Sequence, residues 1–171
     1  MIFSLNFQAL KWIPFNSEID ETDLVNAGEY SGGSMYIARA YHAGDLIPGK
    51  FLPQLNNLCF VSYGGQELEK DEFEVLMNTG FKWVKASEGF VPENAVVGGR
   101  SLTGDKLYVG RTMHGGFNVP GKICRRSKCI YVPYGGEFSH KDYEVLVQIL
   151  QVQEASKGKS SGEFLSQFPA C

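Results

Sequence analysis

The sequence predicts an all-β protein in which two tandem repeats, related by a pseudo-twofold axis, form one compact antiparallel unit. Glycine is frequent, at 20 of 171 residues against a usual share of roughly 7%. Short segments of alternating or β-branched character are separated by turn residues. The same segments also recur in the same order 70 to 72 residues later.

The repeat consists of five matched segments. "LKWI" matches "FKWV", "NAG" matches "VGG", "MYIARAYHAGDLIPGK" matches "LYVGRTMHGGFNVPGK", "FVSYGG" matches "YVPYGG", and "DEFEVLM" matches "KDYEVLV". We therefore define a first repeat, residues 9–78, and a second repeat, residues 80–150. A polar C-terminal tail, residues 151–171, follows, and we expect it to be mobile. Two copies are too few for an open solenoid, so a closed pair is predicted.

The repeated segments have the character of strands. In "MYIARA", Tyr36 and Ala38 face one side, whereas Ile37 and Arg39 face the other. "CFVSY" and "CIYVPY" are rich in β-branched and aromatic residues and stop at Gly-Gly. "FEVLM" and "YEVLV" predict short apolar strands with one acid near the start. No long stretch has the 3.6-residue period of a helix.

The triplet Pro-Gly-Lys occurs once in each repeat and ends at Lys50 and Lys122. Proline sets φ for the second position of a type II turn, and glycine supplies the positive φ of the third. We therefore expect each lysine to project from a rigid turn.

Composition limits the classes of partner. The formal net charge is -3 and the only basic cluster is "CRRSKC", so nucleic acid is not expected as a partner. No apolar run approaches the roughly 20 residues of a membrane span. The N-terminus lacks the features of a signal peptide, so we expect a cytoplasmic protein. The cysteines are expected to be free thiols without a metal site, although Cys124 and Cys129 flank a loop that oxidation could close.

Two repeated histidines, His42 and His114, could serve as catalytic bases. However, the sequence contains no Gly-X-Ser-X-Gly elbow, HExxH, P-loop or GxGxxG motif. We expect no enzymatic activity and no cofactor. The histidines are predicted to be structural, each satisfied by a backbone carbonyl.

Two repeated arginines, Arg39 and Arg111, admit two interpretations. They could contact a ligand, or they could bridge the two repeats through carboxylates. Glu74 and Glu144 recur in step with the arginines, which favours the bridge.

The motifs "VPENAVVGGR", "LYVGR", "PGK", "YVPYGG" and "DYEVLV" resemble the DM-nine repeat, which is found mostly in invertebrates and in tandem pairs. The resemblance covers nearly all of residues 10–150. It implies a β-rich protein, homodimeric in some members, that binds mannose-containing glycans as a lectin and acts in innate immunity as a pattern-recognition molecule. Some relatives move to intracellular vesicles, so a vesicle-associated protein-interaction module without a sugar site is the alternative.

The resemblance also implies the site residues. In mannose-binding relatives, an acid that follows a pair of small residues and the lysine of Pro-Gly-Lys hold the sugar. These positions are Glu29 and Lys50 in the first repeat, and Ser101 and Lys122 in the second. Ser101 cannot carry the charge, so a working second site is not expected unless Asp105 or a residue of the other repeat replaces it. Asp45 is a further acid of the first repeat without an acidic counterpart in the second.

A lysine–carboxylate pair suits a sugar. A carboxylate accepts from vicinal hydroxyls and an ammonium donates to them, and both bonds are charge-assisted. A Glu29–Lys50 pair would supply both groups, and Tyr41 or Tyr63 could cover the apolar face of the ring. Two sites in a chain, or a homodimer, would add avidity. We expect Lys50→Ala to weaken glycan binding more than Lys122→Ala.

Overall fold

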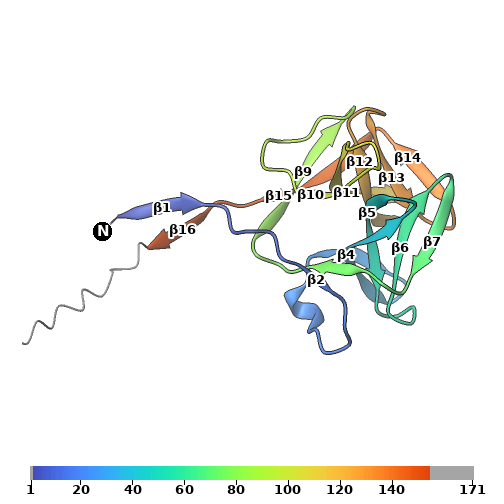
Figure 1. The fold of residues 1–171 in the computed structure, drawn as a ribbon, viewed down its shortest axis with the longest axis horizontal. Helices are drawn as coiled ribbons and strands as arrows, with labels where there is room; N and C mark the ends of the chain where they lie inside the picture. The colour runs from blue at the N-terminus through green and yellow to red at the C-terminus, as the bar shows by residue number, and fades with distance from the viewer. Residues whose placement is uncertain (1, 155–171) are drawn as a thin grey trace, which may run out of the picture.

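The computed structural model describes residues 2–154, and these residues form an all-β protein (Figure 1). The elements are β1 (Phe3–Asn6), β2 (Trp12–Pro14), η1 (Glu21–Asp23), β3 (Asn26–Tyr30), β4 (Gly33–His42), β5 (Asp45–Leu52), β6 (Leu58–Tyr63), β7 (Gln66–Lys70), β8 (Glu74–Leu76), β9 (Phe81–Ser87), β10 (Val97–Arg100), β11 (Lys106–His114), β12 (Phe117–Cys124), β13 (Cys129–Pro133), β14 (Glu137–His140), β15 (Asp142–Gln148) and β16 (Gln151–Glu154). No described helix has the length and apolar character of a membrane span.

Antiparallel pairing joins the two repeats into one sheet system. The longest path runs β14-β13-β12-β11-β10-β5-β4-β8-β2, so β10 of the second repeat lies beside β5 of the first. At this junction Arg100 pairs with Leu46. β9 and β15 form a further pair that joins β11, and β6 and β7 join β5. The predicted antiparallel all-β class is confirmed.

The core consists of four clusters: one within each repeat, one that the repeats share, and a small one of Met35, Leu52 and Phe60 in the first repeat. Phe51 and Val75 lie in the cluster of the first repeat, and Ile123 lies in that of the second. The shared cluster is made by Val25, Ala27, Ile37 and Leu76 together with Val96, Val109 and Leu146. Because neither repeat supplies all of this shared apolar surface, each stabilises the other by burying it.

The predicted Pro-Gly turns are wrong. Pro48-Gly49-Lys50 lies inside β5, and its counterpart lies inside β12. The hairpins that precede them turn instead at Ala43–Gly44, with φ of 49° and 84°, and at Gly115–Gly116, with φ of 59° and 87°. Two successive residues with positive φ are typical of the type I′ hairpin, whose twist matches that of the flanking strands.

Close approach explains the glycine inside each strand. A Cβ added to Gly49 would collide with the carbonyl oxygen of Phe60, and one added to Gly121 would collide with that of Tyr131. β5 also changes its neighbour here, from β10 beside Leu46 to β6 beside Lys50. The Pro-Gly pair therefore permits a change of strand partner, where proline donates no hydrogen bond and glycine leaves room for a neighbouring backbone.

The first and last strands form a separate two-stranded ribbon. β1 pairs with β16 from Phe3↔Glu154 to Asn6↔Gln151, and the ribbon extends away from the body (Figure 1). The expectation of a mobile tail from residue 151 is therefore wrong for residues 151–154, because pairing with β1 orders them. The rest of the tail, residues 155–171, lies outside the described residues.

Candidate functional site

Lys50 is a buried cation that reaches across to the second repeat. Its Nζ donates to the carbonyl oxygen of Pro133 at 2.6 Å and lies 3.0 Å from Glu67 Oε2. Only 4% of the residue is exposed. Burial lowers the pKa of Lys50, and the Glu67 carboxylate opposes that shift.

Lys122 makes the corresponding contacts in the opposite direction. Its Nζ donates to the carbonyl oxygen of Ser62, in the first repeat, at 2.6 Å. It also lies 3.1 Å from Glu137 Oε2. The two acids are equivalent by register, because Ser62 pairs with Glu67 and Pro133 pairs with Glu137. The repeated lysines thus tie each repeat to the other.

The structure does not bring Glu29 to Lys50. Glu29 is exposed and accepts a hydrogen bond from Ser34 Oγ at 2.9 Å. Lys50 pairs with Ile37, and successive side chains of a strand alternate, so Ser34 and Ile37 lie on opposite faces of β4. Glu67, which sequence reasoning did not select, supplies the carboxylate to Lys50 instead.

Asp45 contacts the loop that contains Ser101, whereas Lys122 contacts Ser62 and Glu137. Asp45 Oδ1 accepts a hydrogen bond from the backbone N–H of Leu102 at 2.6 Å. Ser101 closes its own loop, because its Oγ accepts from the N–H of Asp105 at 3.1 Å. Both residues therefore lie at the junction of β5 and β10, where the repeats meet.

The histidines are held by side chains rather than by the carbonyls we predicted. His42 Nδ1 lies 3.0 Å from Lys70 Nζ, and His114 Nδ1 lies 2.9 Å from His140 Nε2. Burial lowers the pKa of His114, and the nearby His140 and Lys50 lower it further. Lys70 and His140 occupy equivalent strand positions, opposite Cys59 and Ile130. A long cationic side chain in one repeat thus replaces an imidazole in the other.

The arginines pair with the recurring acids, but each acid belongs to the same repeat as its arginine, so the predicted bridge through carboxylates is wrong. Arg39 Nε donates to Glu74 Oε1 at 3.1 Å, and its Nη1 donates to the carbonyl oxygen of Gly98 in the second repeat at 3.2 Å. The guanidinium lies 4.3 Å from the ring centre of Trp12. The counterparts around Arg111 are Glu144, the carbonyl oxygen of Ala27 and Trp83. Backbone carbonyls, not the carboxylates, carry the bridge between repeats.

Two shallow hollows flank Tyr41, and both are lined by Arg39, Tyr41 and Leu46. The larger hollow, about 420 Å³, includes Glu74, and the smaller, about 250 Å³, extends to Ser101. Tyr41 is 70% exposed. The side chains of Arg39 and Glu74 are 18% and 31% exposed, so this ion pair is open to solvent in a way that Lys50 is not. We call these two hollows the Tyr41 groove.

The second repeat has a hollow at the equivalent position. It encloses about 320 Å³ and is lined by Met113, Arg111 and Glu144, among others. Met113 is 57% exposed and stands where the first repeat has Tyr41. We call it the Met113 groove. Sequence reasoning missed both grooves because it favoured the bridge over ligand contact for the arginines, although the recurrence of Arg39 and Glu74 was a usable signal.

Comparisons with known proteins identify the family. The DM9 repeat family matches residues 29–138, and the chain therefore belongs to the DM9 repeat family. No curated protein matches. Among solved structures, the nematode sperm cell motility protein MFP2B has a similar fold, with a TM-score of 0.64 and 13% identity. The match covers 86% of this chain and 48% of that protein, so this chain spans about half its length. Family and fold together fit a β-sheet binding module.

Proposed function

We propose that this chain is a carbohydrate-binding protein for mannose-type glycans that acts in pattern recognition in innate immunity. The observation that carries the proposal is the Tyr41 groove. There, an exposed aromatic ring stands beside an arginine–glutamate pair that remains partly open to solvent.

The chemistry of the groove suits a pyranose. A guanidinium has five N–H donors. Arg39 uses one for Glu74 and one for Gly98. Its remaining donors, together with the second oxygen of Glu74, can bond vicinal hydroxyls with charge assistance. The ring of Tyr41 can cover the apolar face of the sugar. The groove thus supplies the cation and carboxylate that the sequence suggested for Lys50 and Glu29.

The site residues predicted from the sequence differ in how close they lie to the Tyr41 groove. Ser101 forms part of the groove wall, and Asp45 fixes the neighbouring Leu102. Lys50 and Lys122 do not line the groove, and their role is to tie the repeats together. Direct contact of either lysine, or of Glu29, with a sugar stays a prediction.

The test is retention on mannan resin followed by elution with free mannose. Wild type should be retained and released, and Tyr41→Ala should bind about 2–10-fold more weakly, since aromatic contacts contribute roughly 0.5–1.5 kcal/mol. Met113→Ala is the matched control at the equivalent exposed position, and its loss should be smaller. Lys50→Ala is tested in the same assay together with a thermal melt. Because Lys50 is buried, its loss can reduce retention by destabilising the fold, and the melt detects that effect. No retention of wild type, or equal losses at Tyr41 and Met113, would reject the proposal.

A second candidate is a vesicle-associated protein-interaction module in the cytoplasm. The ribbon of β1 and β16 favours it, because Phe3, Leu5 and Val152 are 55%, 63% and 65% exposed on an arm that leaves the body. Exposed apolar surface is typical of docking sites for proteins. Binding to a partner or to a second copy that free mannose does not displace, and that Leu5→Ser abolishes, would favour this candidate.

A further inference from the structure

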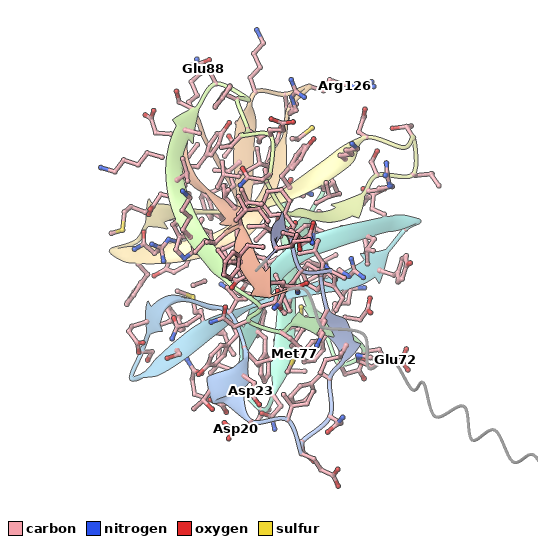
Figure 2. The ribbon with its side chains drawn as sticks, turned by 90° about the vertical axis from the view of Figure 1, so that its left-hand side faces the viewer. Asp20, Asp23, Glu72, Met77, Glu88 and Arg126 are labelled. Atoms are coloured by element: carbon pink, nitrogen blue, oxygen red, sulfur yellow. The ribbon has the colours of Figure 1, made fainter. Side chains whose placement is uncertain are left out.

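A basic corner lies at the hairpin between β12 and β13. Arg125, Arg126 and Lys128 are exposed in this hairpin, and Lys106 joins them from the start of β11. A hollow of about 540 Å³ opens here, lined by Gly104, Asp105, Lys106, Tyr108, Cys124, Arg125 and Arg126. Arg126 lies at the end of the molecule that also carries Glu88, opposite Asp20 and Asp23 (Figure 2). We call this hollow with its four cations the basic corner.

Little negative charge compensates the basic corner. Arg126 Nη2 pairs with Asp105 Oδ1 at 2.9 Å. Glu88, at the same end of the molecule, pairs with Lys141 at 3.5 Å. Among residues 2–154, no carboxylate forms an ion pair with Lys106, Arg125 or Lys128. The protein as a whole has a net charge of -3, yet these cations are gathered at one corner. They repel one another, and an anionic ligand would relieve this repulsion.

The first repeat shows that the fold does not require these charges. Its equivalent hairpin, between β5 and β6, closes with the pair Leu52↔Leu58, as the basic hairpin closes with Cys124↔Cys129. Pro53 and Gln54 stand there in place of the two arginines, and Ser34 stands in place of Lys106. The same scaffold therefore forms without these cations, and the four cations need another explanation.

We infer that the basic corner binds a small polyanion that carries sulfate or phosphate groups. Arginine forms bidentate bonds with such oxyanions, and two exposed arginines and a lysine converge on one hollow. The volume of the hollow, about 540 Å³, lies in the range of small-molecule sites. This site is separate from the Tyr41 groove and does not depend on mannose binding.

Calorimetry with defined probes tests the inference. Sucrose octasulfate supplies sulfate groups, inositol hexakisphosphate supplies phosphate groups, and sucrose is the neutral control. Wild type should bind at least one polyanion and not sucrose, and added salt should weaken binding because exposed charges are screened. Arg125→Gln with Arg126→Gln should weaken binding by about tenfold or more, given the strength of charge-assisted bonds.

The matched control removes the same charge elsewhere. Lys11→Gln with Lys82→Gln alters two exposed lysines outside the hollow and should change affinity less than about twofold. Lys106→Ser, which installs the residue of the first repeat, should also weaken binding and provides a second variant if the arginine pair fails to fold. Retention on mannan should be unchanged in every corner variant. Equal losses in both double variants, no binding to either polyanion, or binding only to anionic vesicles or nucleic acid would overturn the inference.

Discussion

The two repeats differ strongly in formal charge but make the same kinds of contact with each other. Residues 9–78 contain eleven acids and four bases, whereas residues 80–150 contain six acids and ten bases, giving formal charges of -7 and +4. Nevertheless, Lys50 and Lys122 donate to equivalent carbonyls of the other repeat, and Arg39 and Arg111 do the same. We call the contact between the two repeats, with these four bonds, the seam. The difference shows that the seam restricts only a few positions and leaves the surface of each repeat free to change.

The largest expected difference between the repeats concerns the buried lysines. Lys50→Met leaves Glu67 without its cation and should destabilise the fold by about 3 kcal/mol, as broken buried ion pairs do. Lys122→Met should cost about 1 kcal/mol less, because Glu137 keeps the N–H of Gly65 as a donor at 3.2 Å. Urea unfolding of both variants measures this order. An equal or larger loss for Lys122→Met would contradict it.

The glycines inside β5 and β12 should instead behave alike. Gly49→Ala and Gly121→Ala each force a Cβ against a neighbouring carbonyl oxygen, and each should destabilise the protein by about 2 kcal/mol. The midpoint of urea unfolding reports the effect, with Ser139→Ala on an exposed strand position as the control. If only one of the two variants is tolerated, the close approaches of backbone at Gly49 and Gly121 are not equivalent.

An exchange of groove residues should transfer binding between repeats. If the ring of Tyr41 distinguishes the two grooves, Met113→Tyr should raise mannan retention by about 2–10-fold through a second aromatic contact. The reciprocal Tyr41→Met should lower it, and the double exchange should restore it. If neither substitution changes retention on mannan, the sugar binds outside these grooves.

The smallest expected effect is a pH response at His114. The folded state lowers the pKa of His114 below its ordinary value of 6.5, so the unfolded chain binds more protons between those values. Stability should therefore rise as the pH increases towards 6.5 and fall on acidification. Melting temperatures at pH 5 and pH 7 should differ less in His114→Asn than in wild type. An unchanged difference would assign the response to other groups.

The sequence predicted those features that depend on local pattern. Alternation located the strands at 35–40 and 107–112, and the recurrence of Glu74 with Arg39 predicted their ion pair. Both follow from period and spacing, which a single chain displays directly. The all-β class followed from the same pattern.

Contacts between segments that lie far apart in the sequence could not be predicted from it. Pro48-Gly49 has the composition of a turn, yet the approach of Phe60 explains its glycine. The match of Glu67 with Glu137 was hidden because the turn in the second repeat is one residue shorter, which register alone shows. Partners across the seam could not be predicted either, because repeat spacing does not say which strands meet.

The seam has one property with consequences beyond stability. Its four bridging cations all donate to main-chain oxygens, at Pro133, Ser62, Gly98 and Ala27. Every residue carries such an oxygen, whatever its side chain. These four bonds therefore do not depend on the identity of the accepting side chain, although all four accepting residues are buried. The exposed surfaces of the two repeats can therefore differ in charge, as the formal charges of -7 and +4 do, while these four bonds stay the same.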